Sequence, residues 1–381
     1  MTDPLRLFKV TLLALSILFA AHFCLGIVGE TNGISGMLYA DGRPVGGDFI
    51  NLWSVGKLIQ GGRAVEIYRW LDFQAFEEEL TGASIGVRTW AYPPQSLLVF
   101  WPFGLLGFNA AVAAWSALGL TVLWLGARRF GLDGLETAIV LLSPASVMSL
   151  YYGQTGNIAT GLMLMALSAR TPRDALSPIA AALLTIKPQA GFLLPLLWIF
   201  QRRWWAIGVA AGLTIGLAAA TFGLFGIEPW RDYVFDTLPT LGQLEREGTG
   251  PFMSMIPSAF MALRILTGNG DLALLLHLGF AVLVGIVLVV RLLQVSDPVR
   301  RAAMVLIATT LMTPYLHNYD LGLLLCGGLL MARRYPPLTI KALVVLILVG
   351  VAWALPKLVM TLNLLGIPIS PLLILPLLLL A

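Results

Sequence analysis

Asp48 is the acidic side chain whose surroundings most suggest chemistry. It follows two glycines in "GGDF" and directly precedes an amphipathic run, in a chain of 381 residues where only 12% are charged. An Asp at this position can cap a helix by accepting backbone N–H groups of its first turn. The two glycines also let the backbone approach a ligand closely, so that the carboxylate can take a proton from a sugar hydroxyl. Both interpretations stay open, because a capping Asp can also be a general base.

Lys187 lies in an apolar stretch, "TIKPQAGFLL". A lysine near the middle of a membrane costs roughly 2.5–3.5 kcal/mol on insertion scales, and such residues are usually paired and functional. We therefore expect an anionic partner, for which a lipid phosphate is the natural choice. The alternative is a side chain that reaches an interface, which the distance from either predicted membrane edge disfavours.

A second polar group follows an apolar run in "TPYLHNYD". His317 beside Asp320 can bind phosphate or relay a proton, with Asn318 as a neighbour, although an ordinary loop has the same composition. In "YYGQTGN", Gln154 and Asn157 are three residues apart, which places them on one helical face. Their amides are candidates to bind sugar hydroxyls or, alternatively, to join helices.

The remaining polar clusters favour ordinary solvated surface. In the loop segment "PWRDYVFD", Arg231 is the residue whose function a mutation should test. Glu77 to Glu79 are expected on a solvated helix face. We expect no metal, no cofactor and no disulfide, since three histidines and two cysteines give no metal-ligand spacing.

The elements that position these residues are predicted to be membrane helices. The chain is 58% hydrophobic, and apolar runs of about 20 residues, the length of a bilayer span, recur along it. We predict a single all-α polytopic domain over residues 1–381 with about 10–12 transmembrane helices. Residues 30–108 form a first outer loop with amphipathic interface helices, residues 227–271 form a second, and residues 336–381 form the C-terminal spans.

The basic residues set the predicted orientation. Arg6 and Lys9 precede the first span, which places the N-terminus in the cytoplasm. If the predicted spans alternate in direction from there, most acidic residues lie on the outer side of the membrane. We therefore expect an inner (plasma) membrane protein whose site faces the periplasm or exterior. The net charge of +4 reflects this anchoring, and we expect contact with membrane lipids and not with nucleic acid.

Residues 175–200 are flanked by basic residues at both ends and are too short to cross the membrane twice. A re-entrant hairpin that turns at "IKPQ" resolves this and places Lys187 at its tip. Such backbone is tolerated at membrane depth only where it is buried in protein or lines a wet cavity.

Five motifs in chain order resemble glycosyltransferase family 87: "GGDF" with "LIQGGRAVEIY", "WAYPPQSLLVFWPF", "GQTGN", "TIKPQAGFLLPLLW" and "TPYLHNYD". The resemblance implies a GT-C fold and an inverting transfer of a hexose, mannose in the best-known members, from a polyprenyl-phosphate donor. It also implies that Asp48 is the essential acid, and that Tyr92, Lys187 and His317 belong to the site. No nucleotide-binding motif is present, which agrees with a lipid-linked donor.

The acceptor is expected to be a lipid or a glycan. The competing class is a polytopic transporter or flippase of lipid-linked sugars, which also has many spans, a re-entrant segment and a lysine within the membrane. Consumption of a lipid-linked sugar, as opposed to its movement, distinguishes the two classes.

Overall fold

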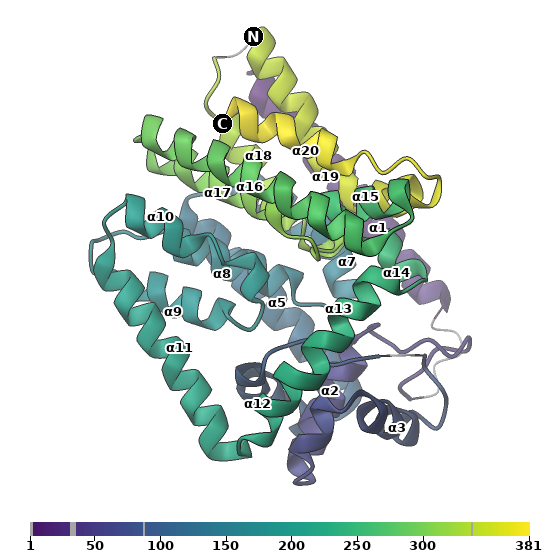
Figure 1. The fold of residues 1–381 in the computed structure, drawn as a ribbon. Helices are drawn as coiled ribbons and strands as arrows, with labels where there is room; N and C mark the ends of the chain where they lie inside the picture. Colours follow the sequence, from purple (N-terminus) through teal and green to yellow (C-terminus); the bar gives the residue numbers. More distant parts are fainter. Residues whose placement is uncertain (1–2, 31–35, 87, 337) are drawn as a thin grey trace.

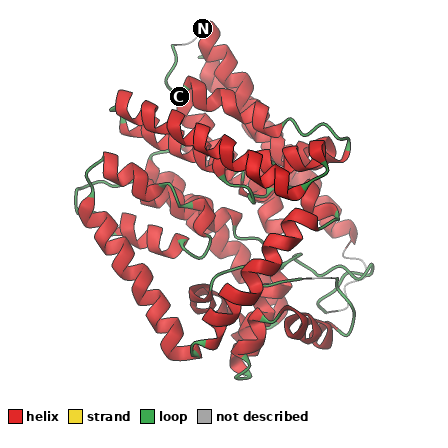
Figure 2. Ribbon diagram, in the orientation of Figure 1, coloured by secondary structure: helices red, strands yellow, loops and turns green. Residues whose placement is uncertain are grey.

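The computed structural model describes residues 3–30, 36–86, 88–336 and 338–381. Within these ranges the chain is helical and contains no strand (Figure 2), apart from an isolated bridge between Leu38 and Pro44. This confirms the all-α class. The order of the helices along the chain can be followed in Figure 1.

Five helices are long and apolar enough to cross a bilayer. A helix satisfies its own backbone hydrogen bonds, which is why such apolar runs fold this way in lipid. Much of their surface faces away from the protein; in α11 only 6% of the most apolar window is buried. These helices confirm a polytopic membrane protein, and they are α1 (Pro4–Glu30), α5 (Phe108–Phe130), α11 (Trp204–Phe225), α16 (Gly270–Gln294) and α19 (Ile340–Leu364).

A sixth candidate span is broken. Helices α6 (Gly134–Leu142) and α7 (Pro144–Tyr151) meet at an angle of 43°, because Ser143 before Pro144 is extended, with a ψ of 156°. Shorter apolar helices include α8 (Gly156–Leu167), α18 (Gly322–Ala332) and α20 (Ser370–Leu380), and α17 (Pro298–Met312) precedes α18. The total number of crossings, about 10–12, stays a prediction.

The predicted hairpin over residues 175–200 is present. It consists of α9 (Leu176–Leu184), a 3₁₀ turn at Pro188–Ala190 and α10 (Leu194–Phe200). Its two ends meet, because Arg203 Nη2 donates to Ser177 Oγ at 3.1 Å. Lys187 lies at the turn and is 5% exposed, which confirms that the tip is buried in protein.

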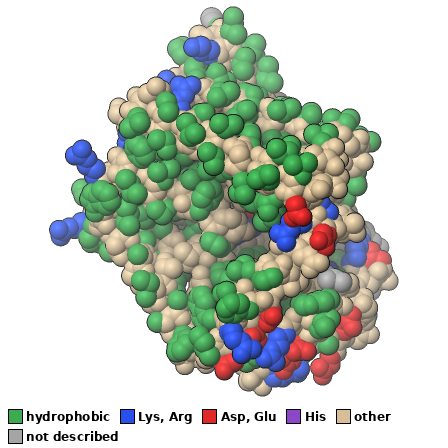
Figure 3. Space-filling view, viewed as in Figure 1, with side chains coloured by type: hydrophobic (Ala, Val, Ile, Leu, Met, Phe, Trp, Pro, Cys, Tyr) green, Lys and Arg blue, Asp and Glu red, His purple; other side chains and the backbone are tan. Residues whose placement is uncertain are grey.

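Residues predicted to be cytoplasmic gather at one end of the helices. Lys9 Nζ contacts Asp133 at 2.9 Å and Glu136 at 2.7 Å, Arg333 binds Glu136, and α1, α6 and α18 are joined in this way. The acidic side chains in view in Figure 3 lie in its lower and right parts, mixed with basic ones, whereas its upper and left edges carry basic side chains alone. The side of the membrane that each end faces stays a prediction.

The two outer loops are built from short helices. The first contains α2 (Phe49–Gln60), α3 (Trp70–Thr81) and α4 (Leu97–Phe100), with 3₁₀ turns at Ala64–Tyr68, Pro94–Ser96 and Trp101–Leu105. The second contains α12 (Glu228–Asp232), a π-helical turn at Tyr233–Thr237, α13 (Leu238–Glu247), α14 (Pro251–Ser254) and α15 (Ala259–Thr267). Their position in the membrane interface stays a prediction, and α2 buries its apolar side in the protein.

Helix α8 holds the "GQTGN" segment in place by packing closely on α5. A Cβ on Gly126 would lie 2.2 Å from the carbonyl oxygen of Gly161, and a Cβ on Gly161 would lie 2.4 Å from that of Val122. Small residues allow membrane helices to approach in this way. The N-terminal end of α8, which carries Gln154 just before it, is therefore fixed beside the first outer loop.

Candidate active site

A glycine turn places Asp48. Gly46 and Gly47 have φ values of +68° and +60°, which few other residues adopt. The Asp48 N–H donates to the carbonyl oxygen of Tyr152 at 2.9 Å. A Cβ on Gly47 would lie 2.8 Å from the Tyr152 Cα, so the two loops touch backbone to backbone.

The Asp48 side chain does not cap α2. It occupies the N-cap position, yet it makes no hydrogen bond to the first turn. Instead Oδ2 accepts from Gln154 Nε2 at 2.7 Å, and Oδ1 binds Arg88 Nη1. The Asp48 side chain is 46% exposed, while that of Arg88 is 17% exposed. Arg88 therefore contacts the carboxylate from the buried side, and the opposite side of the carboxylate is accessible.

The glycine turn gives a sharp prediction. Gly47→Ala should lower the turnover number at least tenfold, because the added methyl group pushes the Asp48 turn off Tyr152, and small displacements of reacting groups cost much of the rate. Gly62→Ala is the matched control, since Gly62 has a similar φ of +69° but open space around its Cβ position. Equal turnover numbers for the two variants, measured on folded protein, would contradict the role of this contact.

Tyr92 extends the network behind Asp48. Its hydroxyl lies 3.3 Å from Gln154 Oε1 and 3.1 Å from Thr155 Oγ1. Gln154 therefore joins Tyr92 to Asp48, and both side chains orient the carboxylate in the structure. This is a more specific arrangement than the sugar-binding amide expected from the sequence.

Lys187 has an anionic partner inside the protein. Its Nζ lies 2.5 Å from Asp320 Oδ1 and 5.2 Å from the centre of the Tyr319 ring. Asp320 is only 3% exposed, so the pair is buried and the lysine charge is balanced without a phosphate. Among the described residues, no three His, Cys, Asp or Glu side chains gather as a metal site.

His317 lies beside this pair. Its ring stacks on Tyr319 with centroids 5.1 Å apart, and its backbone N–H donates to Asp320 Oδ2 at 3.2 Å. Burial lowers the pKa of His317 to about 4, although Asp320 opposes this. The imidazole is therefore neutral at pH 7.

These groups line one cleft made of two overlapping cavities. The cavity of about 490 Å³ contains Lys187 and His317, and the cavity of about 590 Å³ contains Arg43 and Arg88. Asp48 lines both. His317 lines both as well, so the acid lies where the cavity of Lys187 meets the cavity of Arg43 and Arg88.

Four residues singled out in the sequence do not line the cleft, and one of them is Asp320, the buried partner of Lys187. Asn157 is 4% exposed and donates to the carbonyl oxygen of Ser146 at 3.2 Å. Asn318 is fully buried and donates to that of Pro356 at 3.0 Å. Arg231 points to solvent on α12 and contacts Asp232 at 3.3 Å; these placements agree with structural or surface roles.

Two cleft residues escaped the sequence analysis. Arg88 binds Asp48 from 40 positions away. Glu245 on α13 lines both cavities, and its buried Oε2 has no protein partner among the described residues. Burial raises the pKa of Glu245 to about 9, against the opposing charge of Arg264, so that it is a protonated donor at neutral pH.

Glu77 contradicts the expected solvated face. It is fully buried on α3, in one stripe with Phe73 and Phe76. That spacing of three and four residues is the signal that identifies its inward direction. Burial raises the pKa of Glu77 to about 8, with Arg88 acting in the opposite direction.

Glu77 should make stability depend on pH. The folded protein keeps the proton up to about pH 8, while the unfolded chain releases it near the ordinary value of 4.5. Stability therefore falls as the pH rises through this window. We expect the melting temperature to decline between pH 5 and pH 8, and Glu77→Gln to flatten that decline. An unchanged slope in Glu77→Gln, with exposed Glu79→Gln as the control, would contradict it.

A comparison with protein families finds one match. Residues 90–314 match the family model of glycosyltransferase family 87, which is more than half of the chain. The chain belongs to glycosyltransferase family 87. Comparisons with curated proteins and with solved structures find no match.

The family match covers only part of the site. It includes Tyr92, Gln154 and Lys187, whereas Asp48 lies before it and His317 lies just after it. Membership establishes a membrane glycosyltransferase with a sugar donor and an acceptor. The roles of Asp48 and His317 rest on their geometry in this family 87 protein.

Proposed function

We propose that this family 87 protein transfers a hexose, most simply mannose, from a polyprenyl-phosphate donor to an acceptor hydroxyl at the periplasmic face, with inversion. The observation that carries the proposal is the placement of Asp48. Its carboxylate is oriented by Arg88 and Gln154 and lies where the two cavities of the cleft meet. A transporter needs no oriented base at this position.

The donor phosphate is assigned to the side of Lys187 and His317. An anion beside His317 favours the protonated ring, so phosphate binding should raise the low pKa of this histidine and recruit a second cation. Asp320 balances the charge of Lys187 in the structure. Both groups would then stabilise the negative charge that develops on the departing phosphate.

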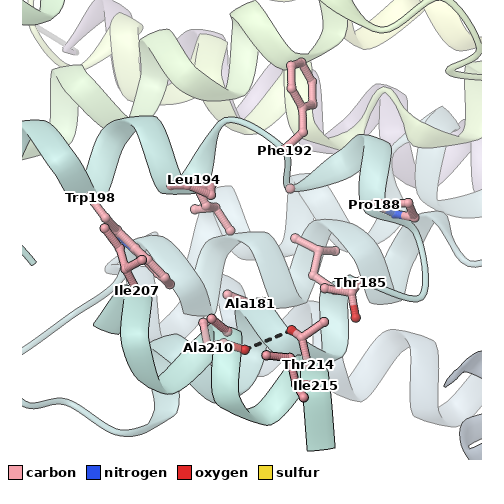
Figure 4. Close-up of a pocket in the computed structure, with 14 residues that line it drawn as sticks. Ala181, Thr185, Pro188, Phe192, Leu194, Trp198, Ile207, Ala210, Thr214 and Ile215 are labelled. Atoms are coloured by element: carbon pink, nitrogen blue, oxygen red, sulfur yellow. Dashed lines mark hydrogen bonds between the residues drawn. The ribbon is translucent and has the colours of Figure 1, made fainter. Parts of the chain in front are cut away.

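An apolar groove adjoins this side and suits the polyprenyl chain. It has a volume of about 440 Å³, lies between α9, α10 and α11, and shares Pro188 with the cavity that contains Lys187. Figure 4 shows Trp198, Ile207 and Ile215 among its walls. A chain in this groove would keep its phosphate next to the hairpin tip.

The reaction is a single displacement. Asp48 accepts the proton of the acceptor hydroxyl as its oxygen attacks the anomeric carbon, and the bond from that carbon to the phosphate oxygen breaks. The electron pair leaves with polyprenyl phosphate. Attack from the face opposite the phosphate inverts the anomeric centre, and Tyr92 and Gln154 keep the base aligned.

The test uses purified protein in nanodiscs with short-chain polyprenyl-phosphate mannose, glucose or arabinofuranose, together with a membrane lipid extract as the acceptor source. We expect release of polyprenyl phosphate, and a glycosylated product, from the mannose donor. Movement of an intact donor across vesicle bilayers without release of polyprenyl phosphate would favour the flippase instead.

A further inference from the structure

A second large apolar cavity adjoins the cavity of Arg43 and Arg88, whereas the groove of Figure 4 adjoins that of Lys187. The second cavity has a volume of about 790 Å³, and it is enclosed by α1, α5, α6 and α7. Its walls include Phe23, Leu120, Trp124, Leu141 and Leu150. We call it the α1–α5 groove.

The α1–α5 groove continues into the catalytic cleft. Tyr39 and Tyr151 line both the groove and the cavity that contains Arg43 and Asp48. Gly46 forms the same end of the groove, two positions before Asp48. A molecule lying in the groove therefore reaches the base through the cavity of Arg43 and Arg88.

The depth of the groove matches a hydrocarbon chain. It follows α5 from Val112 to Trp124, which is about 18 Å at the helical rise of ~1.5 Å per residue. That is more than half of the ~30 Å hydrocarbon core of a bilayer. Carbohydrate hydroxyls would find few partners along these walls, since unpaired polar groups are costly in such surroundings.

The groove is also open to the surroundings of the helices. Trp124 is 48% exposed, and Cys24, another wall residue, is exposed on α1. In a membrane these side chains face lipid, so that a chain can enter sideways from the bilayer.

We infer that the acceptor is lipid-anchored, that its chain occupies the α1–α5 groove, and that its sugar or polar headgroup lies by Arg43 and Tyr151 with a hydroxyl at Asp48. The inference rests on the proposed function, because it assigns the acceptor of that reaction. Donor and acceptor chains then lie in separate grooves and meet only at the base.

The first test is photocross-linking in nanodiscs, with a dodecyl mannoside that carries a diazirine at its chain end. We expect cross-links on peptides of α1, α5 and α6, which Leu120→Trp abolishes by filling the groove. Leu118→Trp is the matched control, because Leu118 is 38% exposed and lies outside the groove. Cross-links spread over all membrane-facing helices, or unchanged in Leu120→Trp, would overturn the inference.

The second test measures transfer to methyl mannoside and dodecyl mannoside with the active donor. We expect the KM for the dodecyl acceptor to be at least tenfold lower, and Leu120→Trp to remove most of that difference while leaving the KM for the donor unchanged. Equal KM values for both acceptors in the wild type would overturn the inference even if transfer occurs. Release from no donor, with cross-links retained in the groove, would instead refute the proposed function and with it the acceptor role.

Discussion

Asp48→Asn should reduce release of polyprenyl phosphate by about 10²–10⁴-fold, the usual contribution of a general base. The amide keeps the size of the side chain, and its one oxygen can still accept from Arg88, while the main-chain bond to Tyr152 keeps the turn and the cleft in place. Because Asp48 acts on the acceptor proton, donor affinity should change little. The measurement is single-turnover release of polyprenyl phosphate together with the Kd of the donor.

Asp72→Asn is the matched control for this prediction. Asp72 is an exposed acid on α3 in the same outer loop and lines neither cavity of the cleft. It should retain full activity. Turnover within threefold of wild type in Asp48→Asn would remove Asp48 from the proposed role, whatever the activity of the protein.

Breaking the Lys187–Asp320 pair should have the second large effect. Lys187→Met leaves a buried carboxylate without a counter-charge, and Asp320→Asn leaves a buried ammonium group without one, each of which costs ~3–5 kcal/mol of stability. The double variant removes both charges, and the amide that replaces the Asp320 carboxylate can still accept from the His317 N–H. We expect the melting temperature to fall in each single variant and to recover in the double variant.

Activity should separate from stability in the double variant. If Lys187 binds the donor phosphate, Lys187→Met with Asp320→Asn stays folded but loses donor affinity at least tenfold. Arg129→Met with Asp174→Asn is the control, because this pair, 2.5 Å apart, lies at the other end of the helices. A double Lys187–Asp320 variant with normal donor affinity would show that the pair only stabilises the fold.

The sequence predicts those parts of the fold that depend on local pattern. The all-helical class follows from the apolar runs, and the hairpin follows from basic flanks on a segment too short to cross twice. The buried tip at Lys187 follows from the same argument. Each of these is a property of one continuous stretch of chain.

The partners within the site depend on contacts between distant segments, which spacing does not reveal. Asp320 lies 133 positions from Lys187, and Arg88 lies 40 positions from Asp48. A lysine in an apolar run indicates an anion, but not whether the anion is a carboxylate or a phosphate. The direction of Glu77 was readable from Phe73 and Phe76, whereas the run of three glutamates suggested solvent.

The backbone contact between the Gly47 turn and Tyr152 has a consequence for changing the sugar that this protein transfers. The main chain of Asp48 is fixed by Tyr152, its carboxylate is held by Gln154 and Arg88, and no contact from the other wall side chains is needed to place it. Residues of the cleft wall such as Thr89, Leu241 and Glu245 can therefore be substituted in a library of variants while Asp48 keeps its position. Selectivity can be redesigned around a chemical centre that does not move.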